Sequence, residues 1–190
     1  MISLFPNLLT ISRIAAAPVL ILLLRDRQYD IALLIFVLAG ISDGLDGFIA
    51  KRYNLVSRLG AILDALADKI LLISVYVMLT VLGHIPFWLL LAVGFRDLLI
   101  VGGYLVLVTL DVSVHRGGPS RLSKVNTCTQ IALVIVILAQ EAGWVVMPWA
   151  VEALVVVVLI TTVLSGAHYL WLWGIKRQTQ SSVDSEVKVD

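Results

Sequence analysis

Four aspartates lie within residues 43–68 of an otherwise apolar chain. Asp43 and Asp46 are spaced i, i+3, and Asp64 and Asp68 are spaced i, i+4, so each pair falls on one face of a helix. Carboxylates at membrane depth are costly, and a cluster of them needs a physical cause. Oxygen ligands without Cys or His suit a hard cation, so the cluster predicts a site for Mg²⁺ or Mn²⁺.

Two such cations would balance the four negative charges. Paired divalent ions suit phosphoryl transfer, because they clamp the attacking and leaving oxygens, and one carboxylate can take the proton of an attacking hydroxyl. The alternative is structural ion pairing with the nearby basic residues, which are Lys51, Arg52, Arg58 and Lys69. Glycine and alanine beside both acidic faces allow close helix approach, which favours the cation site.

The composition places these residues in an integral membrane protein. Of 190 residues, 60% are hydrophobic and 14% are charged, whereas soluble domains have about 45–50% and about 25%. The formal net charge of +1 gives no case for a nucleic-acid partner. Cys128 is the only cysteine, so an intramolecular disulfide is excluded, and no cleavable signal peptide is evident.

The elements that position the aspartates are helices. Six apolar stretches, each near the roughly 20 residues that cross a bilayer, predict an all-α membrane bundle of about six transmembrane helices. They cover approximately residues 4–24, 31–50, 59–82, 87–110, 122–139 and 144–173. The distribution of Lys and Arg predicts that both termini are cytoplasmic. We expect one transmembrane domain over residues 1–177 and a polar, disordered tail over residues 178–190.

The acidic stretch resembles the CDP-alcohol phosphatidyltransferase family, whose pattern is Asp-x2-Asp-Gly-x2-Ala-Arg-x8-Gly-x3-Asp-x3-Asp. The chain matches this pattern at Asp43, Asp46, Gly47, Ala50, Gly60, Asp64 and Asp68. Lys51 is the one departure, since the family has Arg there, and Lys keeps the charge but loses the bidentate fork. Pro6-Asn7-Leu8-Leu9-Thr10 with Arg13 is also similar to the family's N-terminal signature.

The resemblance implies an enzyme in which an alcohol attacks the β-phosphorus of CDP-diacylglycerol and CMP leaves. It implies that two Mg or Mn ions are bound by Asp43, Asp46, Asp64 and Asp68, with Asp68 as the general base. The residues it places at the CDP moiety are Gly47, Lys51 and Ser57, with Asn7 as a weaker candidate. It also implies a homodimer, and we expect a bacterial inner membrane because no organelle targeting segment precedes the first span.

Two further polar stretches bear on the acceptor alcohol. An Arg–Asp pair at membrane depth, here Arg96-Asp97, is functional by default. A cationic pocket of Arg96, Arg121 and Lys124 would bind an acceptor that carries phosphate. One alternative is a self-neutralised Arg–Asp pair that braces the bundle, with or without Lys69. The other is that Arg121 and Lys124 are ordinary positive-inside residues.

Within the family, residues 95–100 and 123–130 look most like the cardiolipin synthases of the eukaryotic type. This resemblance favours phosphatidylglycerol as the acceptor. The alternative is glycerol 3-phosphate, the acceptor of phosphatidylglycerophosphate synthases. A different functional class that could use such carboxylates is an ion-coupled transporter. That hypothesis predicts acidic residues near the bilayer midplane on discontinuous helices. The sequence instead predicts that Asp43 and Asp46 lie near a basic loop on a continuous helix.

Overall fold

A computed structural model describes residues 5–52, 58–109 and 121–186, and the side chains within 13–42, 67–102 and 122–171. All regular structure in these residues is α-helical, as the sequence predicted. The helices are α1 (Phe5–Arg25), α2 (Tyr29–Arg52), α3 (Arg58–Val81), α4 (Phe87–Thr109), α5 (Arg121–Glu141) and α6 (Pro148–Glu186). The first five agree with the predicted apolar stretches to within about two residues.

The last helix differs from the prediction. α6 starts at Pro148, whose fixed φ suits the first turn of a helix, and continues to Glu186. Residues 178–186, which were expected to be disordered, are therefore helical. Residues 176–180 read Lys-Arg-Gln-Thr-Gln, mostly types of high helix propensity, and an apolar helix that has already nucleated can extend through them.

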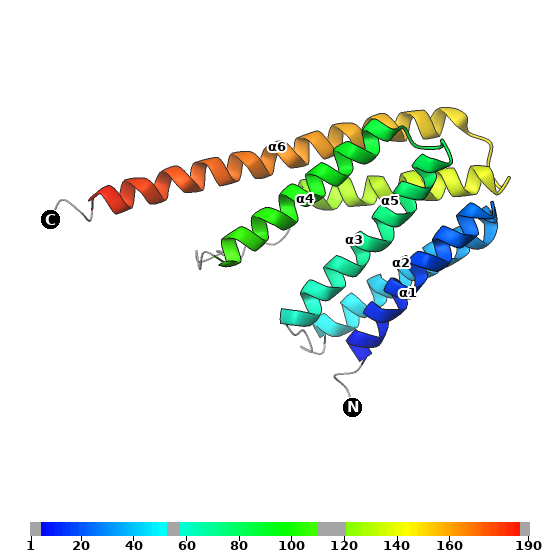
Figure 1. The fold of residues 1–190 in the computed structure, drawn as a ribbon, viewed down its shortest axis with the longest axis horizontal. Coiled ribbons are helices and arrows are strands. Elements are labelled where there is room, and N and C mark those ends of the chain that lie inside the picture. The colour runs from blue at the N-terminus through cyan, green and yellow to red at the C-terminus, as the bar shows by residue number, and fades with distance from the viewer. Residues whose placement is uncertain (1–4, 53–57, 110–120, 187–190) are drawn as a thin grey trace.

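Short turns join α1 to α2, α3 to α4 and α5 to α6 at one end of the bundle (Figure 1). Each turn holds one residue in the left-handed region, namely Arg27 (φ 57°), Gly83 (φ 84°) and Gly143 (φ 75°). Glycine reaches this conformation without a Cβ penalty, which explains the glycines after α3 and α5. We call this the turn end. At the opposite, open end α1 and α3 begin and α2 ends (Figure 1).

Side-chain contacts tie the three turns together. The hydroxyl of Tyr29 lies 3.2 Å from Nε2 of His84, and the two rings pack edge to face. Nδ1 of the same histidine lies 3.4 Å from Oε1 of Glu141. The exposed tryptophans near this end are Trp88, Trp144 and Trp149. Tryptophan is enriched at membrane–water interfaces, so this end has the composition of an interfacial layer.

The apolar core lies along α3, which shares buried side chains with its neighbours. α1 packs against α2 and α3, α5 packs against α6 and α2, and α4 packs against α6. The largest fully buried apolar side chains among the described residues are Leu20, Leu24, Tyr76, Leu79, Ile85, Leu89, Leu133, Ile137 and Leu138. Close packing of this kind supplies the dispersion energy that holds apolar helices together.

The core assignment can be tested with two neighbouring residues of α3. Leu79 is fully buried, whereas Val81 is 72% exposed. Leu79→Ala should lower the free energy of unfolding by about 2–5 kcal/mol, because it leaves a cavity. Val81→Ala is the matched control and should change it by less than about 0.5 kcal/mol. Unfolding followed by circular dichroism in detergent micelles measures both, and equal losses would contradict the assignment.

Candidate active site

The four aspartates lie on two continuous helices at the open end. Asp43 and Asp46 belong to the last three turns of α2, and Asp64 and Asp68 belong to the first three turns of α3. Each pair therefore shares a helix face, as its spacing predicted. Asp68 is the member of the set whose side chain is described, so convergence of the four carboxylates stays a prediction.

The predicted nucleotide contacts fall outside the described side chains. Asn7 lies on α1, and Gly47 and Lys51 lie on α2, where only the backbone is described. Ser57 lies outside the described residues altogether. Their contact with the CDP moiety also stays a prediction.

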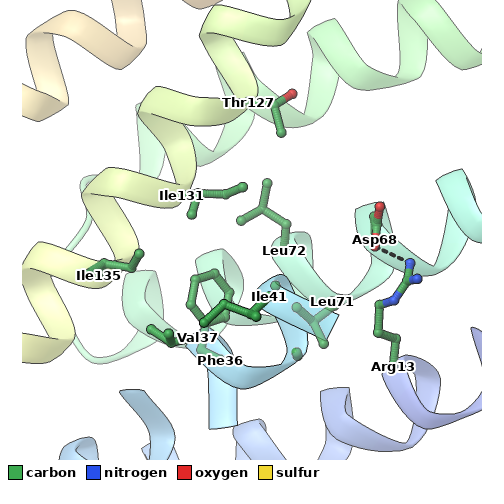
Figure 2. A pocket seen from close by; sticks show the side chains of 12 residues that line it. Arg13, Phe36, Val37, Ile41, Asp68, Leu71, Leu72, Thr127, Ile131 and Ile135 are labelled. Atoms are coloured by element: carbon green, nitrogen blue, oxygen red, sulfur yellow. Dashed lines mark hydrogen bonds and ion pairs between the residues drawn. The ribbon is translucent and has the colours of Figure 1, made fainter. Parts of the chain in front are cut away.

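Asp68 is held by an arginine from another helix. Its Oδ1 accepts a hydrogen bond from Nη1 of Arg13 on α1, with 2.5 Å between the two atoms. The Arg13 side chain is 5% exposed and that of Asp68 is 44% exposed. A buried cation thus orients a partly exposed carboxylate, and Figure 2 shows the pair beside the cavity. Sequence analysis had placed Arg13 only in the N-terminal signature, because its partner is 55 positions away.

Asp68 and Arg13 line a cavity of about 380 Å³. The described lining comes from α1, α2, α3 and α5, and its other members are almost all apolar (Figure 2). Among the residues with described side chains, the lining on α2 reaches Ile41, two residues before Asp43, and the lining on α3 includes Asp68. The acid-bearing segments of α2 and α3 therefore adjoin one cavity.

The donor set in this region fits a hard divalent cation. Its predicted members are all carboxylates, which Mg²⁺ and Mn²⁺ prefer. Asp68 keeps nearly half of its side chain exposed despite its ion pair with Arg13. A carboxylate in that condition can accept another ligand, whereas a buried, fully neutralised one cannot.

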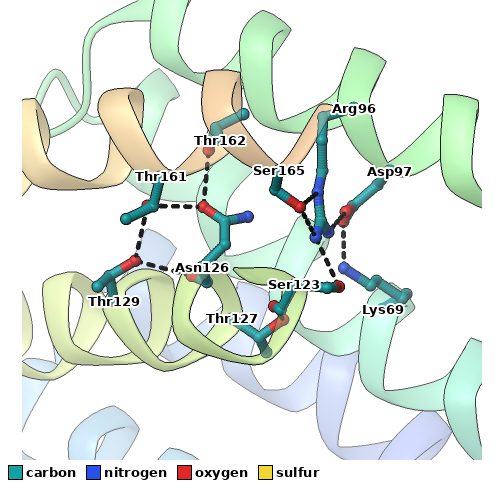
Figure 3. A network of polar contacts seen from close by, with 10 residues as sticks. All are labelled: Lys69, Arg96, Asp97, Ser123, Asn126, Thr127, Thr129, Thr161, Thr162 and Ser165. Carbon is teal, nitrogen blue, oxygen red and sulfur yellow. Dashed lines mark hydrogen bonds and ion pairs between the residues drawn. The ribbon is translucent and has the colours of Figure 1, made fainter. Parts of the chain in front are cut away.

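Arg96 is buried in a polar network. Its Nη1 donates to Asp97 Oδ1 at 2.6 Å and its Nη2 donates to Ser123 Oγ at 2.6 Å. Its Nε and Nη2 also donate to Ser165 Oγ, at 3.2 Å and 2.7 Å. Asp97 Oδ2 accepts from Lys69 Nζ at 2.6 Å (Figure 3). This arrangement is the bracing pair, with Lys69 as a third member, that the sequence left open as the alternative to an acceptor site.

The other two predicted acceptor residues lie on α5. Lys124 is exposed and directly follows Ser123, whose hydroxyl accepts from Arg96. Arg121 is the first residue of α5, and its side chain lies outside the described residues. The structure thus brings the start of α5 to Arg96 through Ser123, and the binding role of the three cations stays a prediction.

A second polar cluster joins α5 to α6. Oδ1 of Asn126 accepts hydrogen bonds from the hydroxyls of Thr161 and Thr162, each at 2.9 Å (Figure 3). Among the described groups, Nδ2 of Asn126 and both polar side-chain atoms of Gln130 have no partner, although both residues are fully buried. Sequence analysis assigned these residues no role. The sequence feature that could have indicated them is the i, i+4 spacing of two amide side chains on an apolar helix. Buried amides without a partner lower stability.

The described residues form an all-helical bundle that carries the paired acidic motif on α2 and α3. Residues 3–158 match the family described as CDP-alcohol phosphatidyltransferase. The chain belongs to this family, as the motif predicted.

The names of similar proteins give two different activities. The cardiolipin synthases (CMP-forming) of Rattus norvegicus and Homo sapiens are 39% and 40% identical over 149 residues, which is 70% of this chain. The match covers 49% and 50% of their lengths, so the chain spans about half of these relatives. The CDP-diacylglycerol–glycerol-3-phosphate 3-phosphatidyltransferase of Rickettsia typhi is 37% identical over 174 residues, covering 86% of this chain and 93% of the relative.

The bracing role of the buried network gives a stability prediction. Asp97→Asn removes the anion between Lys69 and Arg96 and should lower the free energy of unfolding by about 3–5 kcal/mol, because the buried Arg96 and the partly buried Lys69 lose their counter-charge. Asp26→Asn, at an exposed position of the turn end, is the control and should have little effect. The double variant Lys69→Met, Asp97→Asn should recover part of the lost free energy of unfolding, because it removes one of the two cations left without a counter-charge. Wild-type stability of Asp97→Asn in the same micelles would exclude the bracing role.

Proposed function

We propose that the chain is a phosphatidyltransferase with CDP-diacylglycerol as donor and phosphatidylglycerol as acceptor, the reaction of a cardiolipin synthase. The observation that carries the reaction type is the half-exposed Asp68 carboxylate, which is oriented by Arg13 at the edge of a cavity. Membership of the CDP-alcohol phosphatidyltransferase family supports the same chemistry.

In the proposed reaction an acceptor hydroxyl attacks the β-phosphorus of CDP-diacylglycerol. A new P–O bond forms, the bond from this phosphorus to the CMP oxygen breaks, and CMP leaves. The hydroxyl proton passes to the carboxylate of Asp68. Arg13 contributes by fixing the orientation of that carboxylate, which reduces the conformations that must be lost on the way to the transition state.

The remaining predicted residues bind and position the donor. Two Mg or Mn ions would be held by Asp43, Asp46, Asp64 and Asp68. The chemistry that such ions supply is neutralisation of the pyrophosphate charge and of the charge that develops on the leaving group. The nucleotide would be contacted by Gly47, Lys51, Ser57 and Asn7.

The acceptor is proposed on two grounds. Residues 95–100 and 123–130 resemble those of cardiolipin synthases, and the two mammalian relatives carry that name. The alternative acceptor is glycerol 3-phosphate, because the Rickettsia relative matches over nearly its whole length. In either case Arg96, Arg121 and Lys124 are the proposed phosphate-binding residues. Arg96 would then exchange a serine partner for the phosphate, which preserves its pairing with Asp97.

We also propose that six helices cross the membrane, with both termini in the cytoplasm of a bacterial cell and two chains forming a homodimer. Among the described residues, Leu122–Glu141 and Pro148–Trp171 are long and apolar enough to span a bilayer, and Tyr29–Ser42 is a shorter apolar helix. Large apolar side chains are exposed on all six helices, as at Leu22, Leu34, Val77, Leu91, Val125 and Val156. An exterior of this kind suits contact with lipid.

A reconstituted assay tests the reaction and the acceptor together. The purified chain should release CMP from CDP-diacylglycerol when supplied with phosphatidylglycerol and Mg²⁺ or Mn²⁺, and should form cardiolipin, detected by mass spectrometry. A chelator should stop the release, and added Mg²⁺ or Mn²⁺ should restore it. Turnover with glycerol 3-phosphate alone would select the alternative acceptor. Absence of CMP release with every alcohol would refute the enzyme proposal.

The role of Asp68 predicts a separation of turnover from binding. Asp68→Asn should lower kcat by about 10²–10⁴-fold, the usual contribution of a general base. Binding of CDP-diacylglycerol, measured by isothermal calorimetry, should remain detectable. Asp30→Asn, at an exposed position of the turn end, is the control and should keep wild-type kcat. If Asp68→Asn turns over at the wild-type rate, another residue takes the proton.

A further inference from the structure

We propose that the cavity beside Asp68 holds one acyl chain of the acceptor lipid, and that it selects a lipid acceptor over a water-soluble one. This inference rests on the proposed phosphatidyl transfer and adds the substrate class of the acceptor. The Asp68 cavity is defined by Asp68 and Arg13 at its polar edge and by apolar residues of α2, α3 and α5.

The lining separates polar from apolar groups. Figure 2 shows the Arg13–Asp68 ion pair at one edge, with apolar side chains between α2, α3 and α5. These side chains include Phe36, Ile41, Leu71, Leu72, Ile131 and Ile135. Away from Asp68 and Arg13, the described part of the wall offers almost no hydrogen-bond partner to a sugar or a nucleotide, whereas it removes hydrocarbon from water favourably. A volume of about 380 Å³ is within the range of ligand pockets.

The position of the polar edge favours the acceptor over the donor. A general base must lie within hydrogen-bond reach of the hydroxyl that it deprotonates, so the head of the acceptor must reach Asp68. Phosphatidylglycerol carries, in order, free hydroxyls, a phosphate anion and two acyl chains. The Asp68 cavity has the same two-part character, with the Arg13–Asp68 ion pair at one edge and apolar side chains beyond it. Glycerol 3-phosphate has a hydroxyl and a phosphate but nothing to fill the apolar part.

The α2 wall opens to the outside of the bundle at a glycine. Gly40 and Ile41 both line the Asp68 cavity and are both exposed, so the cavity reaches the surface there. A Cβ added at Gly40 would meet no atom within 4 Å. Because a larger side chain would fit, tight packing does not explain why this position is glycine. Glycine within a helix also costs about 0.5–1 kcal/mol of stability relative to alanine. Open space at this position gives an acyl chain a way in from the lipid.

The test fills the cavity from this glycine. Gly40→Leu adds a side chain on the cavity wall, at a position where a Cβ meets no other atom within 4 Å. The control Gly102→Leu adds the same side chain on α4, where a Cβ also meets no atom within 4 Å and which is not part of the described lining. Gly40→Leu should raise KM for dioleoyl-phosphatidylglycerol by about 10-fold or more, the effect of a few methylenes in an apolar pocket. KM for CDP-diacylglycerol, and KM for dihexanoyl-phosphatidylglycerol, should change less than about 3-fold. Gly102→Leu should match the wild type in all three.

Two kinetic outcomes would overturn the inference. If Gly40→Leu raises KM for CDP-diacylglycerol instead, the cavity holds a donor chain. If it leaves KM for both phosphatidylglycerols unchanged, the cavity holds neither chain. Both outcomes leave the proposed phosphatidyl transfer intact, because CMP is still released.

Photo-crosslinking tests the cavity without turnover. Phosphatidylglycerol with a diazirine in one acyl chain, in vesicles with the wild-type chain, should label peptides containing residues 36–41 and 131–135. Gly40→Leu should lose most of this labelling, and Gly102→Leu should retain it. Labelling confined to other peptides would overturn the inference. The readout stands even if no acceptor releases CMP, so failure of the proposed function and failure of the acyl-chain site are separable.

Discussion

A charge inside an apolar bundle must meet an opposite charge, and this constraint determines how α3 fits its neighbours. Asp68 pairs with Arg13 of α1, and the next residue, Lys69, pairs with Asp97 of α4. Consecutive residues of a helix point about 100° apart, so the two ion pairs leave α3 in different directions. Electrostatics therefore fixes the rotation of α3 about its own axis, which apolar contacts alone would leave poorly defined.

The two aspartates illustrate how the same residue type serves different purposes. Both pair with an arginine, but the side chain of Asp97 is 5% exposed and that of Asp68 is 44% exposed. Asp97 also accepts from Lys69, so its charge is surrounded by cations. Burial with two cations suits a residue that holds helices together, whereas exposure beside a cavity suits one that meets a substrate. Solvent access, and not the pairing itself, distinguishes the candidate base from the brace.

Sequence periodicity was sufficient for the helices and for the two acidic faces, because both depend on local spacing. It was insufficient for the contact of Arg13 with Asp68, which depends on how α1 packs against α3. For Arg96 the sequence left two roles open, acceptor binding and bracing of the bundle. In the structure Arg96 pairs with Asp97, which also pairs with Lys69, as the bracing role predicts. The cavity had no sequence signal, since its walls come from four helices. The tail was predicted from its polar composition alone, and α6 continues through residues 178–186.

The hydrogen bonds of Asn126 set the sliding position of α6 along α5. Lipid tails satisfy apolar side chains as well as a neighbouring helix does, so two apolar helices can shift past one another at little cost. One amide oxygen here accepts from Thr161 and Thr162, which are adjacent in the chain. A shift by one residue along the helix axis, about 1.5 Å, would stretch or break both hydrogen bonds together. The Asn126 amide therefore fixes the register between the two helices. This register places Ser165, one turn further along α6, where its hydroxyl accepts a hydrogen bond from Arg96.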